Sequence, residues 1–336
     1  MTVLVTGSAG HLGEALMRLL RGQGREARGI DIKASAFTDL VGSIADRDMV
    51  GQAMEGVDAV LHTATLHKPH VVTHTPQQFI ETNVLGTQLL LDAAAARGVR
   101  AFIQTSTTSA FGDALTPLQG EPASWITEDV RPQPKNIYGA TKLAAEHLCQ
   151  VVARNFGLPV VVLRTSRFFP EDDDNRVRRA EYSTENLQAI ELLGRRADIE
   201  DMATAHLAAI ERASEIGFGT YIVSATSPFV EGDLPWLTSD APAVIARHHP
   251  EAAELFAAAG WRLPQTIDRV YVNRAAQQAL GWEPVRDFRF VLDCVSRGED
   301  FRSELAQTVG AKGYHDEVFE DGPYPVTDVP AGLSRA

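Results

Sequence analysis

Short aliphatic runs alternate with helical patterns over the first two thirds of the chain. Between the first two runs, apolar residues recur at spacings of three and four from Leu12 to Leu20, the stripe of an amphipathic helix that ends at Gly22. This alternation is typical of βαβ units, and we expect an α/β fold with a doubly wound parallel sheet. The runs that predict strands are Val3–Val5, Ala27–Ile32, Ala59–Leu61, Ala101–Ile103, Val160–Leu163 and Thr220–Ser224.

Three further helices and a change of character near residue 225 divide the chain. We expect helices over Phe79–Arg97, Ile137–Phe156 and Ile199–Ala213, and a glycine follows each of the first two. Beyond residue 225, prolines interrupt the pattern and leave only short helical patches. We therefore predict a main domain of residues 1–166, to which 196–224 return, and a smaller C-terminal lobe of residues 167–195 and 225–336.

Charge and composition narrow the class of partner. The 336 residues carry 31 basic and 44 acidic side chains, and the net charge of -13 repels nucleic acid and anionic membrane surfaces. Two cysteines are too few for a disulfide framework, and no apolar run is long enough to span a bilayer. No basic leader precedes the first strand. We expect a soluble, cytoplasmic protein with a small-molecule substrate and no nucleic-acid or membrane partner.

Three glycines directly follow the first predicted strand. Gly7, Gly10 and Gly13 have a spacing that lets the backbone turn tightly and approach a pyrophosphate, and the helix that follows offers free N–H groups. A tight turn alone would use the same glycines, but strand, loop and helix in this order are typical of a dinucleotide fingerprint. Asp31 ends the second strand, where a carboxylate binds a ribose 2′-OH and repels a 2′-phosphate, so the pattern favours NAD over NADP.

A tyrosine and a lysine stand four residues apart near the start of the second long helix. Tyr138 and Lys142 therefore share one helix face. A nearby ammonium lowers the pKa of a phenol toward working pH, which suits a proton-transfer group for an alcohol/ketone couple. A pair on the helix surface would have the same spacing, and the cofactor loop favours the catalytic interpretation.

In this order, the motifs resemble the extended short-chain dehydrogenase/reductases, the NAD-dependent epimerase/dehydratase family. The resemblance extends over about residues 1–225. It implies a Rossmann-type sheet that binds NAD, with a C-terminal lobe that holds the substrate. The stretches that carry the resemblance are Gly7–Gly13, Asp31, His62–Ala64, Asn83–Thr87, Thr105–Gly112 and Tyr138–Lys142.

The resemblance also implies roles for individual residues. Tyr138 would transfer a proton, Thr107 would hydrogen-bond the reacting oxygen, and Lys142 would hold the nicotinamide ribose and lower the pKa of Tyr138. The cofactor-binding residues that it implies are Gly7, Gly10, His11, Leu12, Gly13, Asp31, Ser43, Ile44, His62, Ala64, Asn83, Thr105, Tyr138 and Lys142. We expect substrate contacts from Thr107, Thr108, Arg167, His67 and Arg196, and no metal.

The chain departs from the family pattern at three places. Ser43 stands where many members have an aspartate toward adenine, and Arg167 stands where many sugar-nucleotide enzymes have an asparagine. Arg167 is either a fork for an anionic substrate group or an ion-paired arginine. The third departure is Thr107–Ser109, which lacks the carboxylic acid that a 4,6-dehydratase uses to protonate a leaving hydroxyl, so this sequence disfavours such a dehydratase.

Three charged or histidine-rich stretches leave alternatives open. The segment that contains His67, His70 and His74 is a solvated loop, a substrate-contacting loop or a metal site. Pro69 disfavours the metal site, because it disfavours the regular helix that would place the three histidines on one face. The acidic run Glu171–Asp174 is a solvated loop, which the sequence favours, or a cation site. Arg195 and Arg196 either meet a substrate anion or pair with Asp198 or Asp201.

The function that we expect is NAD-dependent oxidation of a secondary hydroxyl of a sugar or sugar nucleotide, with 4-epimerisation favoured. The alternatives are a dehydrogenase or reductase that releases its product and a non-catalytic dinucleotide sensor. The resemblance implies a homodimer formed through the helices that contain Tyr138 and residues 79–97. Leu85, Leu89 and Ala93 are then either dimer contacts or core residues.

Overall fold

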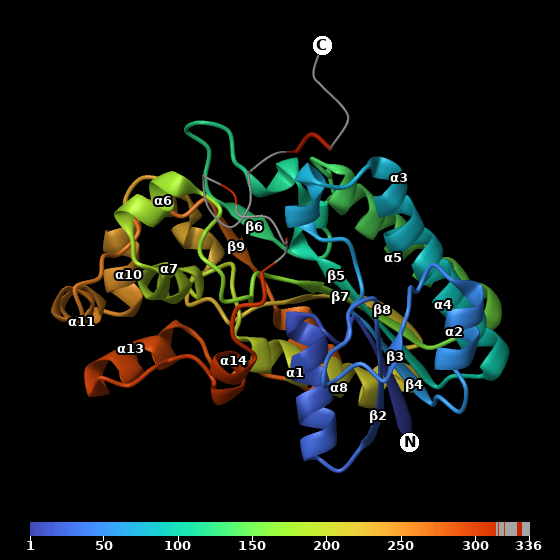
Figure 1. The fold of residues 1–336 in the computed structure, drawn as a ribbon. Coiled ribbons are helices and arrows are strands. Elements are labelled where there is room, and N and C mark those ends of the chain that lie inside the picture. Colours follow the sequence, from blue (N-terminus) through green and yellow to red (C-terminus); the bar gives the residue numbers. More distant parts are fainter. Residues whose placement is uncertain (314, 316–318, 320–327, 331–336) are drawn as a thin grey trace.

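The centre of the molecule, seen in a computed structural model that describes residues 1–313, 315, 319 and 328–330, is a parallel sheet of seven strands (Figure 1). Its order is β3-β2-β1-β4-β5-β7-β8, so the order reverses between β1 and β4, where doubly wound sheets bind their ligands. The α/β fold and the doubly wound sheet expected from the sequence are confirmed. The strands are β1 (Thr2–Thr6), β2 (Glu26–Asp31), β3 (Leu40–Val41), β4 (Ala59–His62), β5 (Ala101–Thr107), β7 (Val160–Thr165) and β8 (Phe218–Val223).

Helices cover both faces of this sheet, because successive strand side chains point to opposite sides. Val3 and Val5 pack in one buried cluster, whereas Leu4 packs in another. The first cluster includes residues of α1 (His11–Gly22), α8 (Ile199–Ile216), α12 (Arg274–Leu280) and α14 (Glu304–Val309). The second includes residues of α2 (Arg47–Ala53), α4 (Gly86–Arg97) and α5 (Ile137–Phe156).

The helix expected at residues 79–97 consists of three consecutive pieces. A short helix α3 (Pro76–Phe79), capped by Thr75, runs into a π-helical turn η2 (Ile80–Leu85) and then into α4. π-Helical turns are frequent at functional sites, and this one carries the buried Asn83. On the same stretch, Leu89 is a core residue and Leu85 is exposed.

A third buried cluster lies beside the sheet and contains residues of both segments predicted for the smaller lobe. Leu187, Phe229, Val270 and Phe288 are among its members. The division into domains stays a prediction, and Ala276 belongs to the core of the sheet instead. The elements here are α6 (Arg176–Glu181), α7 (Thr184–Glu191), η5 (Glu231–Asp233), α9 (Leu234–Leu237), α10 (Ala241–His248), α11 (Ala252–Ala258), α13 (Phe288–Arg297) and the strand pair β6 (Ser124–Ile126) and β9 (Arg269–Tyr271). Residues 314, 316–318, 320–327 and 331–336 of the predicted lobe lie outside the described residues.

Cys149 and Cys294 are both buried and free. In the part of the chain that the structure describes, every helix is too short or too polar to cross a lipid bilayer.

Candidate active site

The glycine loop makes a turn between β1 and α1 that leaves no room for side chains. Gly7 has a φ of 72° and donates its N–H to the carbonyl of Ile30 over 2.8 Å. A Cβ atom on Gly13 would lie 1.9 Å from the carbonyl oxygen of Gly7. Leu12 is buried and His11 is the first residue of α1, so the backbone of this turn is held at the helix N-terminus that a pyrophosphate would approach.

Asp31 lies at the end of β2, beside the same loop. Its carboxylate accepts hydrogen bonds from the N–H of Ala9 at 3.0 Å and of Lys33 at 2.8 Å. Further along the edge, Ile44 is buried against Gly86, and the hydroxyl of Ser43 accepts a bond from the N–H of Ala45. Asp31 is therefore fixed next to the glycine loop by backbone bonds.

Three of the expected cofactor residues, His62, Ala64 and Thr105, form hydrogen bonds with other residues of the protein. The two ring nitrogens of His62 bond the hydroxyls of Thr6 and Thr87 at 2.7 and 3.0 Å, and burial holds the pKa of His62 well below its usual value. The N–H of Ala64 donates to the Thr6 hydroxyl, and the Thr105 hydroxyl bonds Nε2 of His206 on α8. These contacts tie neighbouring strands and helices together, and a cofactor role of the three residues stays a prediction.

Thr107, Tyr138 and Lys142 come together where β5 ends and α5 begins. Asn136 caps α5 by accepting the N–H of Gly139, which sets the first turn of the helix. Tyr138 is 3% exposed and Lys142 2% exposed, so the pair is not a surface pair. The Thr107 hydroxyl hydrogen-bonds Tyr138 and also accepts the N–H of Ser109.

The expected lowering of the Tyr138 pKa by Lys142 is wrong for this structure. Burial raises the pKa of Tyr138, and the Thr107 hydroxyl opposes that rise only in part. Burial also lowers the pKa of Lys142 to about 8, although Cys149 and Glu146 favour its charged form. The physical reason is that both groups are removed from water, which disfavours tyrosinate and ammonium alike.

A buried carboxylate that was not predicted from the sequence lies one helical turn beyond Lys142. Glu146 accepts hydrogen bonds from the Ser106 hydroxyl at 2.5 Å and from Arg164 Nη2 at 2.7 Å. The guanidinium group of Arg164 lies over the ring of Phe111. Glu146 thereby links α5, β5 and β7 beneath the catalytic groups, and its spacing of four from Lys142 is the signal that could have revealed it.

Asn83 forms hydrogen bonds with both the loop after β4 and helix α5. Its side-chain oxygen accepts the N–H of Leu66 at 2.8 Å, and its amide donates to the Leu66 carbonyl and to the hydroxyl of Thr141. These bonds join the loop after β4 to η2 and α5, and the expected cofactor role of Asn83 stays a prediction.

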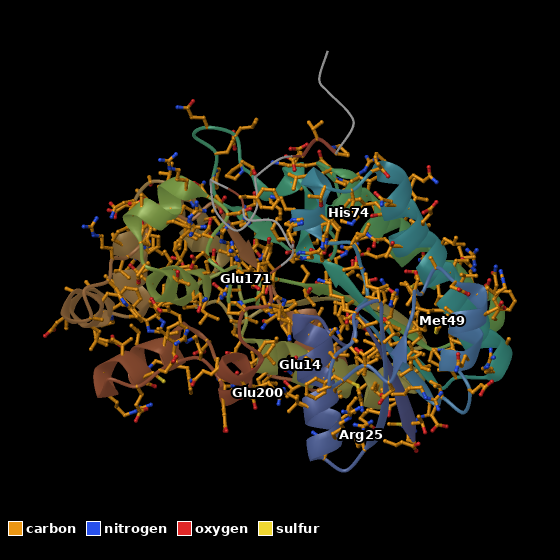
Figure 2. All side chains as sticks on the ribbon, in the orientation of Figure 1. Glu14, Arg25, Met49, His74, Glu171 and Glu200 are labelled. Carbon is orange, nitrogen blue, oxygen red and sulfur yellow. The ribbon has the colours of Figure 1, made fainter. Side chains whose placement is uncertain are left out.

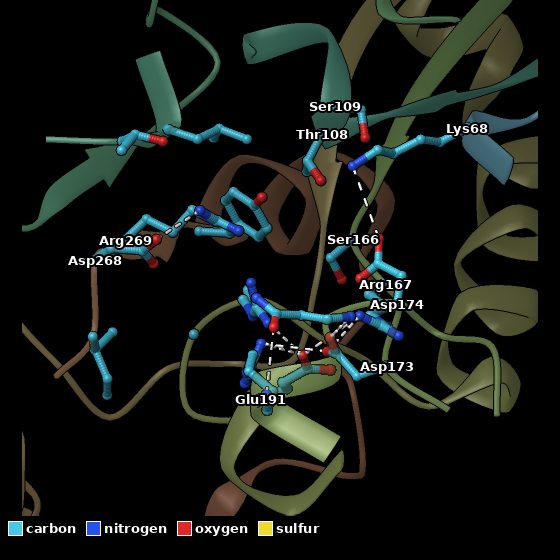
Figure 3. A pocket seen from close by; sticks show the side chains of 18 of the residues that line it. Lys68, Thr108, Ser109, Ser166, Arg167, Asp173, Asp174, Glu191, Asp268 and Arg269 are labelled. Carbon is cyan, nitrogen blue, oxygen red and sulfur yellow. Dashed lines mark hydrogen bonds and ion pairs between the residues drawn. The ribbon is translucent and has the colours of Figure 1, made fainter. Parts of the chain in front are cut away.

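A cavity of about 750 Å³ opens in front of Tyr138. Of the expected substrate contacts, it is lined by Thr107, Thr108, His67 and Arg167. Figure 3 shows Thr108 and Ser109 at one end of the cavity, and the carboxylates of Asp173 and Glu191 at the other. The fifth residue, Arg196, lines a second cavity of about 260 Å³ instead.

The acidic run after β7 is not the solvated loop that its sequence predicts. Glu171 and Asp173 are 8% and 4% exposed. Asp173 pairs with Arg167 at 3.0 Å and with Arg178 at 3.4 Å (Figure 3). Asp173 is buried because Arg167 and Arg178 both pair with it.

Arg195 and Arg196 pair with Glu191, not with Asp198 or Asp201. The distances are 2.5 and 3.0 Å, and burial lowers the pKa of Arg196 to about 10 while Glu191 supports its charge. Asp198 instead caps α8, and Asp201 accepts the N–H groups of residues 285 and 286. Because Glu191 precedes Arg195 by four residues, helical spacing could have found this pair.

The arginine cluster, which we define as Arg167, Arg178, Arg195, Arg196, Asp173 and Glu191, carries more positive than negative charge. Four guanidinium groups surround two carboxylates. Arg167 and Arg178 also reach Glu191, at 3.8 and 3.3 Å. Of these six residues, all but Arg196 line the cavity.

The histidine-rich segment forms a short 3₁₀ turn, η1 (Lys68–Val72), beside Tyr138. The ring of His67 stands edge-on to that of Tyr138, with 5.1 Å between their centres, and His70 Nδ1 accepts the His67 N–H. Burial lowers the pKa of His67 well below its usual value. Among the described residues, no three His, Cys, Asp or Glu side chains form a group suited to a metal ion.

Comparison with known proteins agrees with this geometry. The model of the NAD dependent epimerase/dehydratase family matches residues 3–223. The chain belongs to this family. The curated relatives include a dTDP-glucose 4,6-dehydratase of Streptomyces antibioticus, 34% identical over 185 residues, and a UDP-glucose 4-epimerase of Corynebacterium glutamicum, 31% identical over 173 residues. Each alignment covers 49% of this chain, and the chain spans 53% and 50% of the two relatives.

A solved structure extends the similarity over most of the chain. A short-chain dehydrogenase/reductase superfamily protein from Agrobacterium tumefaciens with bound NAD superposes with a TM-score of 0.61 and 26% identity. The match covers 89% of this chain and 98% of that protein.

The epimerase/dehydratase family is NAD-dependent, and the residues present here fit that cofactor. The glycine loop leaves a bare backbone at a helix N-terminus, as a pyrophosphate requires, and Asp31 lies beside it. A carboxylate at this place accepts a ribose hydroxyl and repels the additional phosphate of NADP. The cofactor of this chain is NAD.

Proposed function

We propose that this chain oxidises a secondary hydroxyl of a sugar or sugar nucleotide with NAD and returns the hydride to the other face of the ketone, which is a 4-epimerisation. The observation that carries the proposal is the buried group of Thr107, Tyr138 and Lys142, of which Thr107 and Tyr138 line a cavity of about 750 Å³. NAD, when bound, accepts and returns the hydride. The protein must then bind, orient and exchange a proton with the hydroxyl.

Tyr138 carries the proton in this proposal. Its raised pKa means that the resting phenol is in the acid form, which is ready to protonate a carbonyl oxygen. In the oxidation direction the tyrosinate must be stabilised, and the Thr107 hydroxyl already hydrogen-bonds it. Thr107 also orients the substrate oxygen, and Lys142 holds the nicotinamide ribose. The cofactor contacts proposed for His11, Leu12, Ser43 and Ile44 follow from their places beside the glycine loop and η2.

The arginine cluster supports the proposal that the substrate carries an anionic group, such as a phosphate or a carboxylate. Three of its arginines, Arg167, Arg178 and Arg195, line the cavity together with Asp173 and Glu191, whose carboxylates lie at the end opposite Thr108 and Ser109. Arg167 is the member that we assign to direct contact, and Arg196 acts through Glu191 because it lines the second cavity. His67 and Thr108 complete the proposed substrate contacts.

A dehydrogenase or reductase that releases its product is the second candidate. The replacement of the usual asparagine by Arg167 favours it, because a guanidinium fork suits a small sugar acid as well as a nucleotide. A non-catalytic dinucleotide sensor has less support, since both Tyr138 and Lys142 are present and buried.

We also propose a cytoplasmic homodimer that pairs through α5 and η2. Val151 and Phe156 on α5 are 41% and 70% exposed, and Leu85 is 44% exposed. Leu89 and Ala93, which were the other candidate contacts, pack with the core of the sheet. Apolar side chains at the surface of these neighbouring elements support an interface there.

One experiment separates the catalytic candidates. The purified protein is denatured and the released dinucleotide is identified, and the native protein is then incubated with NAD and a panel of sugars and nucleotide sugars. An epimerase gives product isomers of equal mass without net NADH, whereas a dehydrogenase gives one NADH for each product. Bound NAD with neither outcome for any substrate would favour the sensor.

A further inference from the structure

The segment that follows α14 returns to the first turn of α1. Val309, at the end of α14, is buried in the same cluster as residues of α1, and Gly310 turns the chain with a φ of 59°. Lys312 Nζ then lies 2.5 Å from Glu14 Oε2, one turn into α1. Residues 310–313 therefore lie against the helix end that faces the glycine loop. Figure 2 shows Glu14 on α1 and Glu171 just beyond that end of the helix.

Glu171 joins three parts of the chain at this place. One of its oxygens, Oε1, lies 2.6 Å from His11 Nε2 and accepts the N–H groups of Lys312 at 3.0 Å and Gly313 at 3.3 Å. Burial would raise the pKa of Glu171, but the contacts with His11 and the Lys312 N–H bring it below its usual value. A carboxylate taken out of water in this way is costly unless such partners hold it.

We propose that Glu171 is a positioning residue that fastens residues 310–313 onto the first turn of α1 and thereby keeps NAD bound between turnovers. The pyrophosphate of a dinucleotide binds at the N-terminus of the helix after a glycine loop, and His11 and Glu14 belong to that turn. The fastened segment lies next to the place where the cofactor is held. Cofactor release then requires the contacts at Glu171 to open.

The inference rests on the proposed function, because an epimerase needs its reduced cofactor until the hydride is returned. A dehydrogenase must instead exchange the cofactor in every cycle. Closing these contacts would slow such an exchange. Glu171 thus gives a structural reason for retention of the cofactor. The chemistry of the site alone permits both epimerisation and dehydrogenation.

The test measures dinucleotide release without any sugar. The full chain is loaded with NADH and mixed with excess NAD, and the loss of bound NADH fluorescence gives the release rate. Glu171→Gln and Lys312→Ala should each release NADH about ten times faster than the wild type. The first removes the charge that the N–H groups of Lys312 and Gly313 contact, and the second removes the ion pair with Glu14. Glu304→Gln, an exposed change on α14, is the matched control and should leave the rate unchanged.

The outcomes also distinguish this inference from the proposed function. Unchanged release in both variants would overturn the role of Glu171 even if sugars are epimerised, and slower release would mean that the segment competes with NAD. Faster release in both variants supports the role even if no sugar is converted. Lys312→Ala alters a partly exposed side chain, so it keeps the test decisive if Glu171→Gln fails to fold.

Discussion

The two ends of the substrate cavity are built in different ways. The catalytic end has Thr107, Tyr138 and Lys142 on the long elements β5 and α5, with hydroxyl groups and a single ammonium. The other end is the arginine cluster, which short helices and loops between residues 167 and 196 bring together. The first end holds groups that exchange protons, and the second holds charges that stay fixed.

This difference separates chemistry from binding. At the catalytic end, burial raises the pKa of Tyr138 and lowers that of Lys142, so it favours the neutral form of both proton-exchanging groups. In the arginine cluster, two buried carboxylates hold guanidinium groups that keep their charge. We therefore expect changes at the catalytic end to alter kcat and changes in the cluster to alter KM.

The largest effect should come from Tyr138→Phe. Removal of the phenol hydroxyl takes away the proposed proton carrier, so kcat should fall by about 10²- to 10⁴-fold. NAD affinity should stay close to that of the wild type, because the ring remains packed between the same neighbours. Steady-state kinetics with the identified sugar and a direct NAD titration measure the two quantities. Retained turnover would contradict the role of Tyr138.

Much of the catalytic end could be predicted from the sequence, because its signals are local. Tyr138 and Lys142 are four residues apart on one helix, and the glycine loop is a continuous stretch after a strand. Short aliphatic runs and apolar spacings of three and four residues likewise predicted the sheet and its main helices. In each case the geometry is set by neighbours along the chain.

The arginine cluster was not predictable by the same means. Asp173 was expected in a solvated loop, and it is buried because Arg167 and Arg178 reach it from different segments. The pKa of Tyr138 also depended on burial, which the spacing to Lys142 does not reveal. What the sequence missed was therefore long-range packing and its effect on charge.

The second-largest effect is expected for Glu191→Gln, which tests the arginine cluster. Glu191 is 4% exposed and pairs with the buried Arg196, so the loss of its charge should lower the free energy of unfolding by about 3 kcal/mol. KM for an anionic substrate should rise about tenfold because Arg167 and Arg195 lose a shared anchor, while kcat changes little. Urea unfolding and steady-state kinetics measure these values. Glu185→Gln, exposed on the same helix α7, should change neither.

A smaller effect is expected at Asp31, which lies beside the glycine loop. Asp31→Ala removes the carboxylate that accepts a ribose hydroxyl, and preference for NAD over NADP should fall by about 10- to 100-fold. Dissociation constants for the two dinucleotides give the ratio. Because Asp31 also holds the N–H of Ala9, Asp31→Asn is the informative companion: it retains an acceptor oxygen but loses the charge. An unchanged ratio in both variants would exclude a ribose contact.

The smallest effect concerns the charge of Lys142. Its pKa is lowered to about 8, so the ammonium loses its proton as the pH rises through 8 and not near 10.5. A neutral amine makes a weaker hydrogen bond to the ribose, by about 1 kcal/mol, so NAD should bind about fivefold less tightly at pH 9.5 than at pH 7. Calorimetric titrations across this range measure the change. Lys142→Arg should bind NAD with little dependence on pH, because a guanidinium group stays charged. If the wild type showed the same flat profile, Lys142 would either keep its proton or make no contact with the cofactor, and the catalytic end would hold fixed charge like the arginine cluster.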